Sequence, residues 1–381
     1  MLSSLAADRK RLAEIDSKIL EIGDDGPDSE LRLERELTQK RLDDYKYPVL
    51  TLPDETILEI FLQLLPVYPV CPPRTGLGSP TLLSHICSQW RKIALASPGL
   101  WRGMAVLLCR HPKFAERRRR QMDLTDTWLV RSRSLPLSLD IISKDLYGEI
   151  DGPGLYEGVV AQIHRWEHVR MSSDIIGMGV FNDLLPSLRS VRLLDGDAEE
   201  YPRNTAFKQA PLLRALSGSS SLLLYATLPW SQLTSLALEG FYPHFVPILR
   251  KTPNLLHCEL QINDTWDLPC EPFRIQLLRL TSLVLKGPWC FPMSRQSTHE
   301  LMRSISTPAL RRLTVAASIL GAYPRSSTPA LATFISNSED CELEELNVVY
   351  EGCGADRDCD CESEYRHKFP AISNIFVGGF R

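Results

Sequence analysis

The sequence predicts an α/β protein in which N-terminal helices precede an irregular, open solenoid of repeated strands. Two helical patterns come first, a heptad-like one within residues 3–46 and a cluster of apolar anchors within residues 52–101. From residue 166 onward, the pattern apolar-x-x-apolar-x-apolar recurs with 20 to 33 residues between successive units. This spacing is typical of solenoids, in which each unit buries its apolar face only against its neighbours.

Composition indicates an ordinary protein of two or three domains. The chain has 381 residues, of which 44% are hydrophobic and 24% are charged, and its net charge is -4. This balance gives no general attraction to nucleic acid or to an anionic membrane, so neither is expected as a partner. The chain begins without the apolar core of a signal peptide, and its 10 cysteines are irregularly spaced. We therefore expect reduced thiols and a location in the cytoplasm, the nucleus or both.

Residues 1–46 are expected to form an N-terminal helical or coiled-coil segment. A break at residues 23–27, Gly-Asp-Asp-Gly-Pro, separates a first helix from a charged second helix over residues 31–42. The first helix carries a heptad-like seam: Leu5, Leu12, Ile15, Ile19 and Ile22. The pattern predicts a short coiled-coil hairpin or an arm for self-association through residues 3–46, with a solvated helical tail as the alternative.

Residues 47–105 are expected to form a helical domain interrupted by a Pro-rich insertion. Pro53 opens the first helix, and Pro80 opens a second helix that Ser97-Pro98-Gly99 ends. The first helix is apolar on two adjacent stripes: Ile57, Phe61 and Leu64 on one, and Leu58, Leu62 and Leu65 on the other. So wide an apolar arc cannot be hidden in a small module, which predicts a partner. The insertion at residues 66–80, rich in proline, is expected to loop out between the helices.

The order of these anchors resembles the F-box, the adaptor-docking module of cullin-RING ubiquitin ligases, in the form abundant in fungi. The resemblance covers Leu50 to Trp101 and includes Leu-Pro-x-Glu at residues 52–55, Ile-Cys-x-x-Trp-Arg-x-Ile-Ala at 86–94 and Pro-x-Leu-Trp at 98–101. The insertion departs from the short turn usual in the family. The resemblance implies binding to a Skp-type adaptor, through contacts or the core that shapes them, by Leu52, Pro53, Ile57, Phe61, Leu64, Cys87 and Trp90.

The recurring units resemble leucine-rich repeats and place a linker and a repeat domain over residues 106–381. An alternating stretch at residues 135–141 predicts a strand before them. The first anchors of the units are Trp166, Leu188, Leu213, Leu233, Leu255, Leu280, Leu310, Leu343 and Ile372. The asparagine expected after each unit is present only at Asn263, so we expect an irregular, open horseshoe without a regular asparagine ladder. Its concave positions, sampled from Thr234 to Asn347, mix charges without a dominant chemistry.

Catalytic patterns are missing, and the chain is expected not to be an enzyme and to need no cofactor. It lacks a Gly-x-Ser-x-Gly elbow, a P-loop and a His-Glu-x-x-His motif. Cys353, Cys359, Cys361 and His367 offer soft ligands, but their spacing is unusual for zinc, and a loop with free thiols is the alternative. The basic run at residues 117–120 is either a phosphate-binding or nuclear-import signal or a solvated helix face.

The resemblances together imply a substrate receptor of a ubiquitin ligase complex. The F-box would dock onto a Skp-type adaptor, the repeats would bind an unknown substrate protein, and other subunits would transfer ubiquitin. Two alternatives stay open: a non-degradative interaction scaffold with an inactive F-box, and a zinc-binding protein that uses the C-terminal cysteines.

Overall fold

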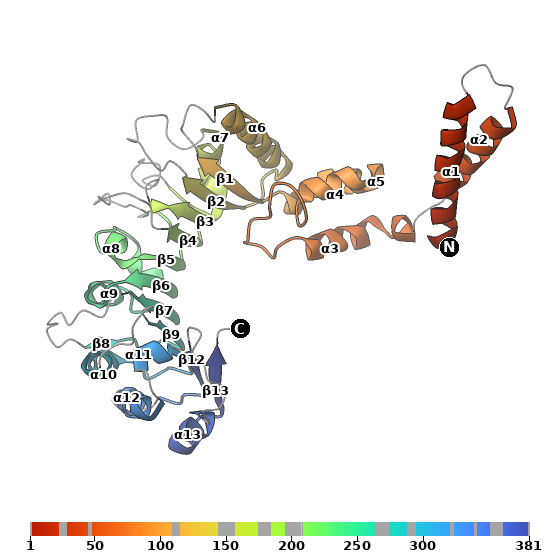
Figure 1. The fold of residues 1–381 in the computed structure, drawn as a ribbon. Helices are drawn as coiled ribbons and strands as arrows, with labels where there is room; N and C mark the ends of the chain where they lie inside the picture. The colour runs from red at the N-terminus through yellow and green to blue at the C-terminus, as the bar shows by residue number, and fades with distance from the viewer. Residues whose placement is uncertain are drawn as a thin grey trace.

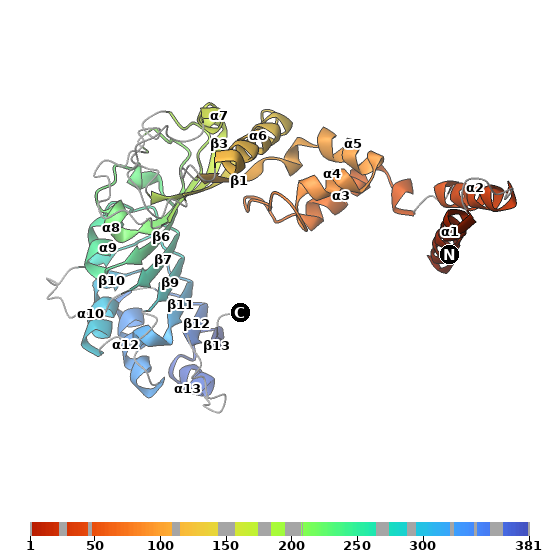
Figure 2. The same ribbon diagram turned by 45° about the horizontal axis from the view of Figure 1, so that its top comes forward.

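A computed structural model shows that the protein has a mixed α/β fold (Figure 1). The part of the chain that it describes contains a long parallel sheet and 13 α-helices. Helices α1 and α2 lie at one end, α3 to α5 follow, and the sheet extends from there to the C-terminal strand (Figures 1 and 2). The described residues are 2–22, 29–44, 48–108, 115–143, 157–173, 184–194, 207, 209–263, 274–287, 295–320, 324–338, 341–350 and 361–379.

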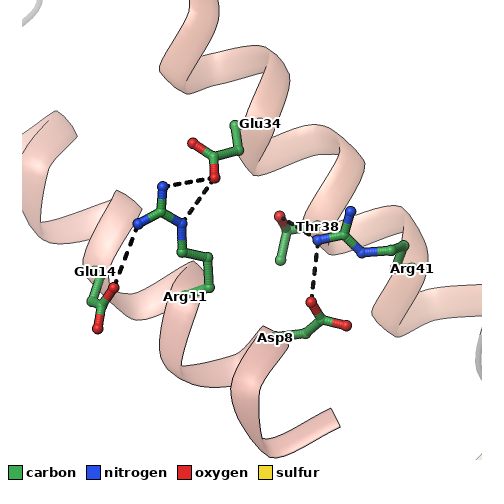
Figure 3. Close-up of polar contacts among 6 residues, drawn as sticks. All are labelled: Asp8, Arg11, Glu14, Glu34, Thr38 and Arg41. Carbon is green, nitrogen blue, oxygen red and sulfur yellow. Dashed lines mark hydrogen bonds and ion pairs between the residues drawn. The ribbon is translucent and has the colours of Figure 1, made fainter. Parts of the chain in front are cut away.

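The predicted N-terminal helix pair is confirmed as α1 (Leu2–Ile22) and α2 (Ser29–Asp44). Between the helices, Ile15 and Thr38 are fully buried. Ion pairs also join the two helices. Figure 3 shows Arg11–Glu34, at 2.8 Å, and Arg41–Asp8, at 3.1 Å. Another, Arg35–Asp16 at 2.7 Å, lies outside that view. Leu33 and Leu37 of α2 stay exposed. Self-association through this hairpin stays a prediction.

The next helices begin and end largely where the sequence predicts. They are preceded by a short 3-10 helix, Pro48–Thr51. The first helix is α3 (Asp54–Leu64), and the second region begins at Pro80 and ends at Ala96, just before Ser97. The Ser79 hydroxyl caps its start by accepting a hydrogen bond from the Thr81 N–H at 3.1 Å.

The prediction of one continuous second helix is wrong, because the region is divided into α4 (Pro80–Ile86) and α5 (Ser88–Ala96). Cys87 lies between them with extended backbone angles, φ -154° and ψ 172°. Its sulfur accepts a hydrogen bond from the Trp90 N–H at 3.4 Å and so caps α5. The Arg91 side chain then ties α5 to α4 by donating to the Ser84 carbonyl at 2.9 Å.

Eleven strands form one sheet whose spatial order follows the chain: β1, β2, β3, β4, β5, β6, β7, β9, β11, β12 and β13. Every neighbouring pair is parallel. The strand bounds are β1 Gly103–Leu108, β2 Leu137–Ser143, β3 Trp166–Ser172, β4 Ser190–Leu194, β5 Ala215–Ser219, β6 Ser235–Gly240, β7 His257–Ile262, β9 Ser282–Lys286, β11 Arg312–Ala316, β12 Glu345–Tyr350 and β13 Asn374–Gly379. A separate short pair joins β8 (Ile275–Gln276) and β10 (Ile305–Ser306).

The nine predicted repeat units coincide with β3 to β7, β9 and β11 to β13, and the predicted strand at residues 135–141 with β2. The second and third anchors of neighbouring units lie in register across the sheet. They are buried, for example, at Val169 and Met171 of β3 and at Leu236 and Leu238 of β6. The edge strand β1 was not predicted from the sequence, and the expected domain boundary between residues 105 and 106 falls inside it.

Helices accompany the strands, and α8, α9, α10 and α12 lie along one side of the sheet (Figures 1 and 2). Their buried side chains, among them Phe245, Ile248 and Leu301, close the core that the strands begin. The bounds are α6 Ala115–Arg131, α7 Glu157–Val160, α8 Ser220–Leu223, α9 Tyr242–Leu249, α10 Arg295–Ser304, α11 Ala317–Leu320, α12 Pro324–Asn337 and α13 Cys361–Lys368.

The Pro-rich insertion forms a non-helical connection between α3 and α4, as expected, but it does not project freely into solvent. Residues 66–79 form a strap that packs on the first strands of the sheet. Pro72 is buried, and its Cδ lies 3.1 Å from the position that a Cβ on Gly103 of β1 would take. The Arg74 side chain donates to the Ala105 carbonyl in β1.

The strap also contains turns of its own, because the Val70 N–H donates to the Val67 carbonyl at 3.0 Å and the Ser79 N–H donates to the Gly76 carbonyl at 3.2 Å. Its Pro69 carbonyl accepts a hydrogen bond from the Ser138 hydroxyl in β2.

None of the helices in the described ranges is both long and apolar enough to cross a bilayer.

Candidate functional site

Helices α3, α4 and α5 are here called the helical module. Of the residues that the sequence indicates for adaptor binding, Ile57, Phe61 and Leu64 lie in α3 and Trp90 lies in α5. The other three, Leu52, Pro53 and Cys87, flank these helices.

The predicted residues fall into three groups by burial: buried, exposed and half-buried. Ile57 and Phe61 are fully buried, and the Phe61 ring meets Trp90 of α5 edge to face, with centroids 4.9 Å apart. These side chains therefore shape the module from inside and do not contact a partner directly.

Exposed apolar side chains occur on all three helices of the module. On α3, Leu62 is 44% exposed and Leu64 is 54% exposed. On α4 and α5 the exposed apolar residues are Leu82, Ile86 and Leu95. Together with the exposed Pro53 before α3, these side chains are here called the apolar surface of the module. They are the apolar side chains of the module that a protein partner could cover.

The remaining predicted residues lie between core and surface. Leu52, Cys87 and Trp90 are half-buried, and Leu52 and Trp90 pack against the core cluster. The indole nitrogen of Trp90 is buried and has no hydrogen-bond partner among the described residues. A buried donor left unpaired costs about 1–3 kcal/mol. The module therefore retains Trp90 at an energetic cost, with the ring held against Phe61.

Trp101 joins the module to the sheet domain. Its indole N–H donates to the Ala94 carbonyl in α5 at 2.8 Å, and its ring meets Trp128 of α6 edge to face at 5.4 Å. The Arg131 guanidinium lies over the same ring, 4.4 Å from its centroid. Because Trp101 is fully buried among these contacts, α5 and α6 are held in one packed unit.

The strap makes a second connection, through Tyr68. The phenol O–H of Tyr68 donates to Glu167 of β3 at 2.8 Å, and the Arg102 guanidinium lies 3.6 Å from the ring centroid. Burial raises the pKa of Tyr68 above its usual range, and the hydrogen bond to Glu167 adds to this rise. The tyrosine thus remains a neutral donor at physiological pH.

Further along the strap, Cys71 bonds to β2. Its sulfur donates to the Ser138 carbonyl at 3.3 Å, and burial raises the pKa of its thiol to about 11. Tyr68, Cys71 and Arg74 of the strap therefore bond to β3, β2 and β1, respectively, and Arg74 also bonds to α6. The strap also lines one side of a groove of about 260 Å³, which α3 closes on the other side with Leu62 and Leu65.

The candidate metal ligands are placed only in part. Cys353 and Cys359 lie outside the described residues, Cys361 begins α13, and His367 is exposed near its end. Across the described ranges, no three His, Cys, Asp or Glu side chains come together in a way that would hold a metal ion. The basic run at residues 117–120 lies within α6, where Arg120 pairs with Glu116 one helical turn away.

One group of residues was missed by the sequence analysis: the arginines on the exposed face of β3 and β4 and at the starts of β4 and β5. Arg170 and Arg192 are exposed and lie opposite each other in the register of β3 and β4. The signal was present, because each occupies the x position between the last two anchors of its unit. The concave positions sampled from the sequence began only at Thr234 and so left these units out.

No protein-family model matches this chain, and no curated protein matches it in sequence. The case for a function therefore rests on the residues and geometry described above.

Proposed function

We propose that this chain is a non-catalytic adaptor with two binding parts. The helical module, which resembles an F-box, docks onto a Skp-type adaptor of a cullin-RING ubiquitin ligase. The sheet domain, which resembles a set of leucine-rich repeats, binds the protein to be modified. Ubiquitin transfer belongs to other subunits, and the chain contributes by raising the effective concentration of a target lysine near the loaded enzyme.

The observation that carries the proposal is the incomplete burial of α3. Of its apolar residues only Ile57 and Phe61 are buried, whereas Leu62 and Leu64 stay largely exposed. Covering apolar surface contributes about 25 cal/mol per Å², so a partner that covers these leucines and Ile86 of α4 gains a substantial part of its binding free energy. A Skp-type adaptor is the partner that the F-box resemblance indicates.

The strand order supports the second half of the proposal. The strands of the large sheet are parallel and follow the chain order, so that each repeat unit lies beside the unit before it. An irregular, open horseshoe of leucine-rich repeats requires this arrangement. The strand positions that do not face the core then form a long surface, as in the register row of the half-buried Ala215 and Ser235 and the exposed His257. A surface of this form suits recognition of another protein better than it suits enclosure of a small substrate.

A second candidate function is a non-degradative scaffold that does not bind the adaptor. The strap favours it, because an insertion of this length between the two halves of an F-box departs from the family pattern, and here it is fixed against β1, β2 and β3. The zinc-binding alternative depends on residues mostly outside the described ranges. Elemental analysis of purified protein decides it by the presence or absence of stoichiometric zinc.

Co-expression of the chain with a Skp-type adaptor, followed by pull-down, tests the proposal. Leu64→Asp places a charge on the apolar surface without touching the core, and Leu184→Asp is the matched control, since Leu184 is 57% exposed before β4. We expect the wild type and the control to capture the adaptor and Leu64→Asp to lose it. Absence of a complex with folded wild type would overturn the proposal in favour of the scaffold. Equal capture by all three variants would overturn the assignment of the docking surface to the apolar surface around Leu64.

A further inference from the structure

The exposed face of β3 and β4 brings two arginines side by side. Arg170 and Arg192 are register partners in adjacent parallel strands, so their side chains project from the same face of the sheet. Their neighbours in sequence, Val169 and Val191, are buried on the opposite, core face. Like charges directly opposite each other across strands are destabilising, and an anion bound between the two guanidinium groups would remove that cost.

Two more arginines extend this positive region along the starts of β4 and β5. Arg189 and Arg214 are both exposed, and they are adjacent because the Arg214 N–H donates to the Arg189 carbonyl at 2.9 Å. We call the group of Arg170, Arg189, Arg192 and Arg214 the arginine surface.

The acidic residues nearby neutralise only part of this charge. Asp140 pairs with Arg170 at 2.9 Å, and Glu167 pairs with Arg189 at 2.9 Å. Glu167 is shared, because it also accepts the hydrogen bond of Tyr68 in the strap.

Among the residues that the structure describes, the other two arginines have no acidic partner. Arg214 donates only to the backbone carbonyls of Pro211 and Leu213, and Arg192 has no hydrogen bond or ion pair within the described part of the chain. Within the described ranges, two of the four positive charges are therefore not neutralised by a carboxylate.

Small side chains beside the arginines leave room for an extended chain to lie close to the sheet. Arg192 is in register with Ser217 of β5, which is in register with Ala237 of β6. The backbone groups of these strands already pair with each other in the sheet, so a ligand must be recognised by side chains. Guanidinium groups bind carboxylates and phosphates by paired, charge-assisted hydrogen bonds.

We propose that the arginine surface binds an acidic segment of the target protein, one that carries carboxylates or phosphorylated side chains. This inference rests on the proposed function, since it names the chemical class of target that the sheet domain receives. Nucleic acid is disfavoured, because single-stranded binding uses exposed aromatic rings, and the exposed positions of β3 to β6 carry no Phe, Tyr or Trp.

The test is fluorescence anisotropy with the full-length protein at low salt. Three labelled probes are compared: an oligoglutamate peptide, the same peptide with phosphoserine in place of some glutamates, and a uridine oligonucleotide of equal charge. Arg170→Gln/Arg192→Gln removes the central pair. Arg250→Gln/Arg303→Gln is the control, because it makes the same charge change at exposed positions after α9 and in α10.

We expect both peptides to bind the wild type and the control, and the central double variant to bind about tenfold or more weakly, as the loss of charged hydrogen bonds implies. Tighter binding of the phosphorylated peptide would assign phosphate as the recognised group, and equal binding would assign carboxylate. Absence of peptide binding, an equal loss in the control, or preference for the oligonucleotide would overturn the proposal. Because no adaptor is present, this result is independent of the adaptor pull-down.

Discussion

At the scale of single residues, burial separates the roles of the side chains predicted for adaptor binding. Phe61 lies at the centre of the helical module, where it contacts Trp90, whereas Leu64, one turn further along α3, is exposed. In the proposed function Phe61 maintains the shape of the docking surface and Leu64 contacts the partner. The two residues therefore predict different experimental signatures.

Phe61→Ala is expected to destabilise the module by about 3–5 kcal/mol, because it leaves a cavity in a fully buried site. Leu64→Ala should change stability by about 0.5 kcal/mol or less, as surface substitutions usually do. Hydrogen exchange of the α3 and α5 peptides in the full-length variants measures the difference. Equal protection of these peptides in the two variants would contradict the assigned core position of Phe61.

Burial also predicts which cysteines react. The thiol pKa is raised to about 11 at Cys71 and to about 12 at Cys258, because burial disfavours the charged thiolate. Below these values the neutral thiol dominates, so little of either cysteine is the reactive thiolate at pH 8. Mass-spectrometric mapping of maleimide labelling should find both protected in the folded protein and labelled in urea. Rapid labelling of either in the native state would contradict their burial.

The sequence predicted the apolar stripes of α3 but not the burial of each member. Helical spacing places Ile57, Phe61 and Leu64 on one face. Leu64 is nevertheless exposed, at the last residue of α3. Periodicity gives the direction of a side chain, whereas its exposure depends on which neighbouring elements pack over it.

At the scale of elements, the strap is the feature that most changes the sequence-based account. Arg74 anchors it with side-chain hydrogen bonds to Ala105 of β1 and to Gln121 and Thr125 of α6. Burial lowers the pKa of this arginine, but the carbonyl groups around it satisfy its donors. The strap thereby fixes the link between α3 and α4 against the sheet domain.

Arg74→Gln should loosen the strap, because the shorter amide cannot reach all three partners. We expect faster amide exchange across residues 66–79, equivalent to a loss of about 1–3 kcal/mol in the local opening free energy. Thr75→Ala, at an exposed position of the same strap, is the control and should exchange like the wild type. Unchanged exchange in Arg74→Gln would show that the strap is held by its other contacts.

The elements that were predicted share a repeated local pattern, and those that were missed lack one. The nine strands of the large sheet from β3 onward follow a spacing of buried anchors that the sequence displays directly. The break at Cys87 depends on one backbone conformation, which no periodicity reveals. The strap's partners, from Ala105 to Glu167, are 31 to 99 residues away, so local patterns carried no information about them.

At the scale of the whole molecule, the proposed binding parts are separate but mechanically connected. The helical module lies beside the first strands, and the sheet continues from there to β13 (Figures 1 and 2). Trp101 and the strap hold the module to α6 and to β1, β2 and β3. In the proposed adaptor, this connection would keep a bound target at a defined position relative to the ligase, which is what catalysis by proximity requires.

The central claim is that the helical module docks onto a Skp-type adaptor. The most direct measurement is light scattering on the eluting complex after purified chain and purified adaptor are mixed and separated by size. We expect one species that contains the 43.1 kDa chain and the adaptor in equal numbers, with a mass equal to their sum or a multiple of it. Two separate peaks from folded wild-type chain, at concentrations well above those used in the pull-down, would contradict the claim.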